Sequence, residues 1–259
     1  MADVRAQRVY PLDAAIATTA ARPDDDPRAW APRRALTMLT ATVAVIVVFG
    51  GVVGGLNPTD LESSWATVAG EGLLAIPVVV YARRAVHAAG GWGAGLGLTP
   101  PRWSDVPIAI GWVIVQFIAR FAAGLVLLGL LPAARHERVS NVPTLADKPW
   151  TVLLPLIVAV VVVAPIVEEL AFRGFMLRSF TRAWGFRAAA IATGLLFGLL
   201  HFEQAGGPAA SVILAGTLAV FGYLQAVLVR RTARLAPAMI VHGLNNAVSI
   251  TLALHLHLH

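Results

Sequence analysis

Residues 150–182 read WTVLLPLIVAVVVVAPIVEELAFRGFMLRSFTR, an apolar run that carries two adjacent carboxylates, Glu168 and Glu169. A charge near the centre of a membrane helix costs about 2.5 to 3.5 kcal/mol on insertion scales, so this ionisable pair indicates a functional site. Glu169 and Arg173 are four residues apart, with the acid first, which favours an ion pair on one helix face. Glu168 points about 100° away and is predicted to keep its carboxylate free.

The composition indicates a polytopic membrane protein. Of the 259 residues, 58% are hydrophobic and 13% are charged, and the mean hydropathy is +0.74. A soluble domain does not require so apolar a chain. The absence of cysteine excludes disulfides, thiolate metal sites and a cysteine nucleophile. The net charge of +6 follows the loops between apolar runs, so we expect a lipid bilayer as partner and no nucleic acid.

Apolar runs of near-membrane length predict an all-α transmembrane bundle of about seven spans, with eight possible. The spans are expected near 35–56, 65–82, 105–131, 150–172, 188–203, 209–229 and 235–254. We therefore divide the chain into a disordered cytoplasmic tail (1–34), N-terminal transmembrane helices (35–149) and a transmembrane core that carries the two glutamates (150–254), for which the family resemblance given below implies a catalytic role. Because basic residues concentrate in alternate loops, the N-terminus of this multi-pass cell-membrane protein is predicted to be cytoplasmic and the C-terminus external.

Four polar residues are predicted to meet at one membrane depth. Glu168 lies fourteen residues before Arg182, and His201 lies fourteen after Arg187. At about 1.5 Å per residue, both lie about 21 Å along their helices from the cytoplasmic side. From the same side, His242 and Asn246 lie about 12 and 18 Å along the last span, and they share a helix face.

The order of these motifs resembles that of a known family. EExxxR (Glu168 to Arg173), FxxxH (Phe197 to His201) and HxxxN (His242 to Asn246) follow one another as in the intramembrane proteases that include the CAAX prenyl endopeptidase and its bacterial relatives, the CPBP or Abi proteins. The resemblance covers roughly residues 150 to 254. It implies an intramembrane endopeptidase that acts on a membrane-associated or lipidated protein or peptide. The catalytic set would be Glu168, Glu169, Arg173, His201, His242 and Asn246.

The residue types fit peptide hydrolysis without a covalent intermediate. A carboxylate in apolar surroundings suits a general base that takes a proton from water and later returns it to the leaving amine. Glu168 is the candidate base, and His201 would orient the water. His242 and Asn246 would donate hydrogen bonds to the oxyanion.

The residues leave open whether the site works without a cofactor or holds a divalent metal. Glu168, His201 and His242 are a plausible zinc set by ligand type. We favour a metal-free site, because Asn246 is better explained as a hydrogen-bond donor.

Other functions are compatible with the same polar cluster. The protein could be a non-enzymatic immunity or scaffold protein, or a proton-coupled transporter.

A second pair of charges lies inside the predicted spans. Glu71 and Arg120 are expected about 18 to 22 Å from the cytoplasmic ends of neighbouring spans, where they would form a structural salt bridge.

Overall fold

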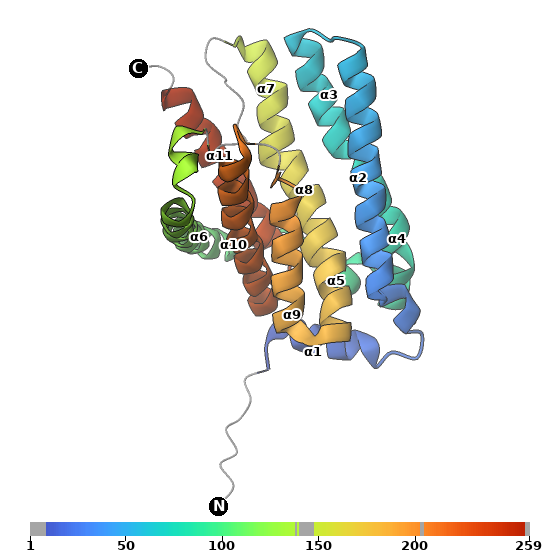
Figure 1. Ribbon diagram of the computed structural model, residues 1–259. Coiled ribbons are helices and arrows are strands. Elements are labelled where there is room, and N and C mark those ends of the chain that lie inside the picture. Colours follow the sequence, from blue (N-terminus) through green and yellow to red (C-terminus); the bar gives the residue numbers. More distant parts are fainter. Residues whose placement is uncertain (1–8, 138, 140–147, 203–204, 257–259) are drawn as a thin grey trace, which may run out of the picture.

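The computed structural model describes residues 9–137, 139, 148–202 and 205–256, and in these ranges its regular elements are all helices. Among the described residues, six stretches are long and apolar enough to cross a membrane: Pro32–Gly55, Asp60–Ala88, Asp105–Leu130, Trp150–Leu199, Pro208–Thr232 and Ala236–Leu254. Trp150–Leu199 reverses direction at Gly185, whose φ of 76° interrupts the helix (Figure 1). This stretch supplies two passages, so the predicted all-α bundle of about seven spans is confirmed.

The helices follow the chain with short connections. Their bounds are α1 (Pro11–Ala20), η1 (Pro27–Trp30), α2 (Pro32–Gly55), α3 (Asp60–Leu73), α4 (Ala75–Ala88), α5 (Trp92–Leu96), α6 (Asp105–Leu130), η2 (Pro132–His136), α7 (Trp150–Val158), η3 (Ala159–Val163), α8 (Ala164–Glu169), η4 (Leu170–Met176), α9 (Leu177–Leu199), α10 (Pro208–Thr232) and α11 (Ala236–Leu256). The segments η3 and η4 are π-helices, and η1 and η2 are 3₁₀-helices.

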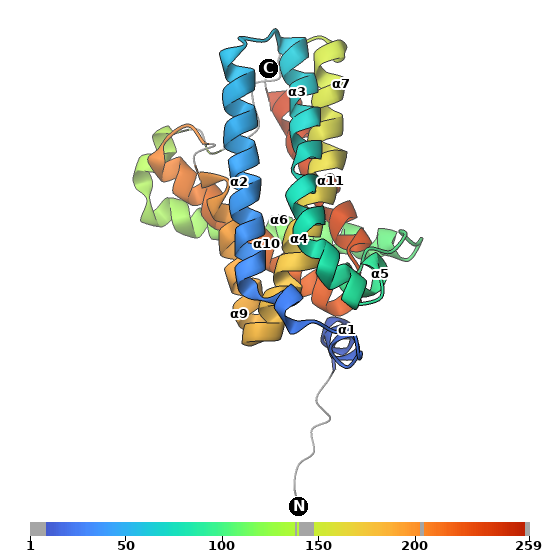
Figure 2. The same ribbon diagram turned by 90° about the vertical axis from the view of Figure 1, so that its right-hand side faces the viewer.

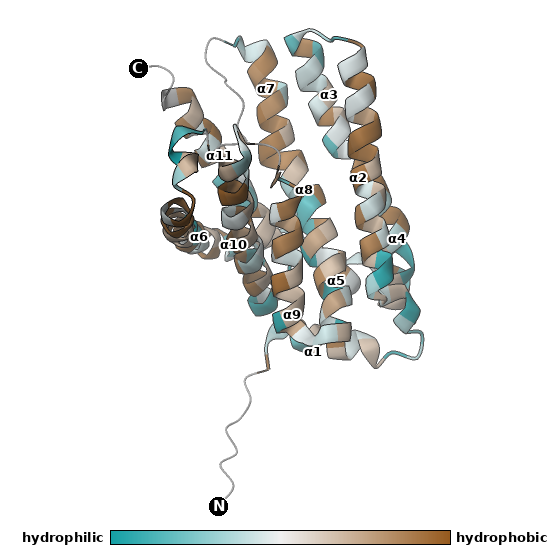
Figure 3. Cartoon of the chain, viewed as in Figure 1, coloured by the Kyte–Doolittle hydropathy of each residue, from teal (hydrophilic) through white to brown (hydrophobic). Residues whose placement is uncertain are grey.

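The helices of the bundle are not all parallel to one another. Figure 1 shows α6 end-on, and Figure 2, turned by 90°, shows it along its length, so α6 runs across the direction of α2 and α7. Apolar residues cover most of α2 and α7, whereas hydrophilic ones gather around α1 and the adjoining end of α4 (Figure 3). The C-terminal end of α11 lies at the opposite end of the bundle from α1, which agrees with an odd number of spans.

The prediction of a disordered tail over residues 1–34 is wrong for the part that the structure describes, from residue 9 onward. Leu12 in α1 and Trp30 in η1 are buried against the bundle. Asp13 pairs with Arg230 at 2.8 Å, and Asp25 pairs with Arg182 at 3.2 Å. These contacts fasten a polar segment to the basic end of the bundle, where composition alone suggested no packing partner.

Two prolines explain where the spans depart from regular α-helix. Pro77 lacks the N–H that would bond the Leu73 carbonyl, and the second predicted span accordingly divides into α3 and α4. Pro165 is the second residue of α8, which begins at Ala164 directly after η3. The missing proline N–H leaves carbonyls in η3 without an intrahelical donor, which becomes important at the site.

Helices α9 and α10 approach each other closely through small residues. A Cβ on Gly194 would meet the Ala219 carbonyl of α10, and one on Gly198 would meet the Ala215 carbonyl. This G-x-x-x-G spacing is typical of tightly packed membrane helices. The close approach fixes the end of α9, from which Phe197 and His201 reach the centre of the bundle.

Candidate active site

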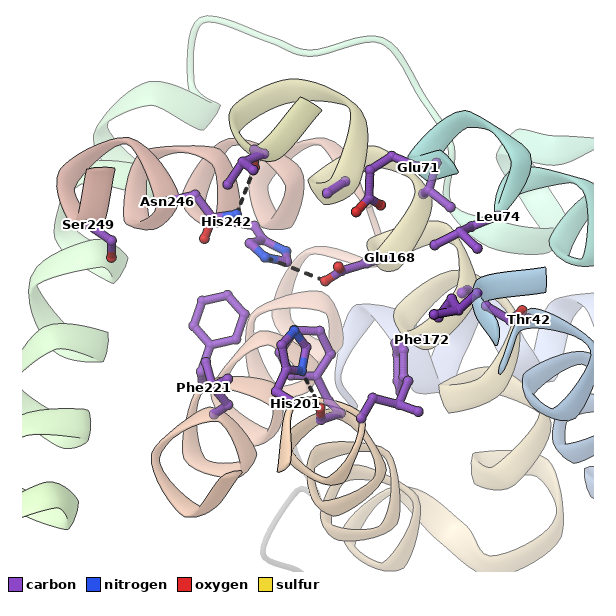
Figure 4. A pocket seen from close by; sticks show the side chains of 18 of the residues that line it. Thr42, Glu71, Leu74, Glu168, Phe172, His201, Phe221, His242, Asn246 and Ser249 are labelled. Carbon is purple, nitrogen blue, oxygen red and sulfur yellow. Dashed lines mark hydrogen bonds and ion pairs between the residues drawn. The ribbon is translucent and has the colours of Figure 1, made fainter. Parts of the chain in front are cut away.

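Four of the predicted site residues, Glu168, His201, His242 and Asn246, line one cavity of about 380 Å³ (Figure 4). They come from α8, from the turn after α9 and from α11. Their meeting at one cavity agrees with the common depth predicted from the sequence. The remaining wall is mostly apolar and includes Leu74, Leu156, Phe172, Leu200, Phe221 and Ile250.

Glu169 lies behind this cavity and is fully buried. Its Oε1 accepts a hydrogen bond from Arg173 Nη1 at 3.0 Å, which confirms the predicted ion pair. Arg173 is also fully buried, and its Nη2 donates to the Gly222 carbonyl of α10 at 3.3 Å. Its guanidinium lies 4.7 Å from the centre of the Phe197 ring. Glu169 and Arg173 thus join η4 to α9 and α10 without facing the cavity.

Glu168 is the carboxylate that faces the cavity, and its side chain is 23% exposed. Its Oε2 lies 3.7 Å from His242 Nε2, and no hydrogen-bond partner of Oε2 is found within the described ranges. The neighbouring Glu169 is fully buried and has its Oε1 engaged by Arg173 and His242, although its Oε2 also has no hydrogen-bond partner in the described ranges. The predicted separation of the two side chains by helix phase is therefore present in the structure.

His242 is held between the two glutamates. Its Nδ1 lies 3.0 Å from Glu169 Oε1, and because an ionised carboxylate only accepts hydrogen bonds, Nδ1 is the donor. Nε2 faces Glu168. The imidazole also packs against the rings of Phe221 and Phe197, with centroids 4.9 and 5.9 Å away. These contacts fix both the position and the orientation of the ring.

His201 has one nitrogen engaged and one available. Its Nδ1 lies 2.8 Å from the Phe197 carbonyl, which can only accept, so Nδ1 carries the proton. Nε2 then has a free lone pair in the neutral ring. Figure 4 shows His201 across the cavity from Glu168 and His242. The cavity is thus bordered by two acceptors, a carboxylate and an imidazole nitrogen.

Asn246 has a structural contact that the sequence did not indicate. Its Nδ2 donates to the Val160 carbonyl in η3 at 2.8 Å. In η3 the Ala164 N–H bonds the Ala159 carbonyl, so the next donor for Val160 would be the N–H that Pro165 lacks. Asn246 supplies this missing donor from α11. Its amide has a second N–H, which remains available at the cavity wall.

A chain of buried amides behind the site was missed by the sequence analysis. Asn245 Nδ2 donates to Gln116 Oε1 at 3.1 Å, and Gln116 Nε2 donates to Gln225 Oε1 at 3.2 Å. Gln225 Nε2 then donates to Glu169 Oε1 at 3.4 Å and to the Ala238 carbonyl at 2.9 Å. All three amide residues are buried. The only signal was the presence of carboxamides in apolar spans, which does not identify their partners.

The predicted salt bridge between Glu71 and Arg120 is wrong. Both residues line the cavity, but they form no ion pair with each other in the described part of the chain. Arg120 lies over the Phe221 ring, with its Cζ 5.7 Å from the centroid. Figure 4 shows Glu71 and Phe221 on opposite sides of Glu168 and His242. Because α6 crosses the bundle, equal distances along the chain do not place the two charges together.

The side chains do not fit a bound metal as they stand. No group of three His, Asp or Glu residues lies close enough to hold a metal ion among the residues that the structure describes. Of the candidate ligands Glu168, His201 and His242, each histidine has its Nδ1 engaged and a lone pair on Nε2 in the neutral ring, so the obstacle is the spacing of the side chains and not the ligand types. We therefore derive no step through a metal.

Comparison with known proteins concerns the second half of the chain. Residues 149–248 match the family model described as Type II CAAX prenyl endopeptidase Rce1-like. Searches of the curated proteins and of the solved structures gave no significant match. The family match points to an intramembrane protease, and the apolar helices agree with a multi-pass membrane protein. The segment that contributes Glu168, His201 and Asn246 to the cavity therefore lies within the part of the chain that is similar to the Rce1-like type II CAAX prenyl endopeptidase family.

Proposed function

We propose that the protein is an intramembrane endopeptidase that cleaves a membrane-associated protein or peptide with a water molecule activated by Glu168. One observation carries the proposal: Glu168 faces the same cavity as His201, while the adjacent Glu169 is occupied by Arg173 and His242. Only one of the two glutamates is therefore free to act on a substrate. The cavity lies among apolar helices, where a membrane-associated chain would reach it.

The two acceptors suit the activation of one water. A water that donates one hydrogen to Glu168 and the other to Nε2 of His201 would direct an oxygen lone pair at a carbonyl carbon between them. Glu168 takes a proton as the new C–O bond forms. The C–N bond then breaks, and Glu168 returns the proton to the leaving amine. No covalent enzyme intermediate is needed.

The negative charge on the carbonyl oxygen requires donors. Asn246 offers its second amide N–H from the cavity wall, and His242 offers Nε2 when both of its nitrogens are protonated. Such a donor typically contributes about 10² to 10³ in rate. In this proposal Glu169 and Arg173 act indirectly, because they hold His242 and the helices around it.

The substrate class follows from the lining. Apart from the polar groups, the wall consists of aliphatic and aromatic side chains from α2, α4, α7, η4, α10 and α11. Such a lining favours a peptide with apolar side chains or an attached lipid. We propose a membrane-associated or lipidated polypeptide as the substrate.

The test is turnover of apolar peptides by the purified protein in detergent, read by mass spectrometry. We expect cleavage by the wild type and none by Glu168→Gln, which keeps the side-chain shape but cannot accept the proton. His201→Ala should be similarly inactive. Full activity of Glu168→Gln would overturn the glutamate mechanism. Activity that is lost with a chelator and restored by zinc would replace it with a metal mechanism.

A further inference from the structure

Arg120 on α6 is a partly buried cation that the proposed mechanism does not use. It lines the cavity beside Phe221, and it has no hydrogen bond or ion pair to any described residue. Its Nε is completely buried without a partner. Charged side chains inside a membrane bundle normally pair with one another or mark a functional path, because leaving them unpaired is costly. Arg120 therefore needs an anionic partner that the described chain does not provide.

The fully buried arginine of the site, Arg173, shows the contrast. Arg173 has a carboxylate at 3.0 Å, a carbonyl at 3.3 Å and two aromatic rings around it. The chain thus provides partners where a buried guanidinium has a structural task. Glu71 and Glu168 both line the cavity with Arg120, yet neither pairs with it. Arg120 differs from Arg173 in that none of its nitrogens bonds a described residue, although Nε is buried without a partner in both.

The position of Arg120 is fixed by its neighbours on α6. Gln116 lies four residues earlier and is held between Gln225 of α10 and Asn245 of α11. Residues four apart share a helix face, so these hydrogen bonds set the rotation of α6 that turns Arg120 toward the cavity. The guanidinium then rests over the Phe221 ring, which leaves its edge free for hydrogen bonds. A side chain held in this way is ready to bind without first being ordered.

We propose that Arg120 binds a carboxylate of the substrate and thereby sets which way the peptide lies in the cavity. Glu71 and Glu168 would repel an anionic group, and Arg120 is the sole arginine or lysine among the described residues of the lining. Guanidinium and carboxylate match in geometry and can form two parallel hydrogen bonds. The carboxylate would lie on the Phe221 side of Glu168, away from Glu71 (Figure 4). The inference rests on the proposed function for the substrate but concerns recognition alone.

The carboxylate can come from the end of the peptide or from an acidic side chain. The experiment uses one apolar peptide in three forms: with a free C-terminal carboxylate, with a C-terminal amide, and as the amide with one internal Asp. Affinity is measured for the Glu168→Gln protein in detergent, so that binding is observed without turnover. We expect one of the two carboxylate forms to bind about ten- to a hundredfold more tightly than the amide, as for hydrogen bonds to charged groups.

Arg120→Gln in the same background should abolish this preference while leaving the affinity for the amide form unchanged. Arg120→Lys should restore part of the preference, since lysine keeps the positive charge but lacks the two parallel N–H donors of the guanidinium. Glu71→Gln is the matched charge removal on the other side of the cavity; because it takes away a repelling carboxylate, the preference for the carboxylate form should persist or increase. Equal binding of all three forms, absence of binding, or a preference that survives Arg120→Gln would overturn the inference. Failure of the proposed function shows separately, as absence of turnover by the wild type.

Discussion

Glu168 and Glu169 are adjacent in the chain and flank the same His242 ring, but Glu168 faces the cavity whereas Glu169 is buried behind it. Glu169 is fully buried and shares its Oε1 among Arg173, His242 and Gln225. Glu168 faces the cavity with an Oε2 that has no hydrogen-bond partner in the described ranges. The pair thus divides into a carboxylate that supports structure and a carboxylate that is available for chemistry.

The first prediction tests this division with matched substitutions. Glu168→Gln should abolish cleavage and leave the melting temperature close to that of the wild type. Glu169→Gln should lower the melting temperature and reduce cleavage only in part, because it leaves the fully buried Arg173 without its charge partner, which typically costs about 3 to 5 kcal/mol. Peptide turnover and thermal melting of the purified variants provide both readings. If both variants changed activity and melting temperature in the same way, the two glutamates would not have separate catalytic and structural roles.

A second prediction concerns the buried amide chain. Gln225→Leu would leave Gln116 Nε2 and the Ala238 carbonyl without partners, and each such group costs about 1 to 3 kcal/mol. We expect a clear loss of thermal stability and a reduced kcat, because Glu169 also loses a donor. Tyr223→Phe, on the half-exposed face of the same helix, is the control and should melt like the wild type. Unchanged stability of Gln225→Leu would show that the amide chain contributes little.

The sequence predicted those parts of the site that depend on spacing along one helix. The pairing of Glu169 with Arg173 needs only a four-residue interval, and the meeting of Glu168 with His201 needs only helix lengths counted from basic loops. Interactions between helices that are distant in the sequence could not be predicted in this way. Gln116 and Gln225 gave no sign of their partners, because a carboxamide bonds equally well to many groups.

Two errors have physical causes that the sequence does not carry. The Glu71–Arg120 pair assumed that spans run side by side, whereas α6 crosses the bundle. The tail looked disordered because it is rich in charge, proline and alanine. Its acidic residues instead meet Arg182 and Arg230 at the end of the bundle. In both cases the tertiary arrangement decided which charges meet.

The third prediction is topological. The basic loops predict a cytoplasmic N-terminus, and α1 and the C-terminal end of α11 lie at opposite ends of the bundle. Reporter fusions should therefore place a tag before Met1 in the cytoplasm and a tag after His259 outside. Both tags on one side of the membrane would require a different number of crossings.

The last prediction separates the two roles of Asn246. Asn246→Ala removes the donor to the Val160 carbonyl and also the N–H proposed for the oxyanion. We expect lower thermal stability together with a loss of about 10² to 10³ in kcat. Activity alone cannot distinguish a distorted site from a missing donor.

Pro165 provides the means to tell these causes apart. Pro165→Ala restores a backbone N–H close to the carbonyls of η3, so Val160 regains a donor without Asn246. The double variant Asn246→Ala/Pro165→Ala should therefore recover stability relative to Asn246→Ala while its kcat stays low. The single variant Pro165→Ala controls for any effect of the proline on activity. Recovery of kcat together with stability would assign Asn246 a purely structural role, and the oxyanion would then depend on His242.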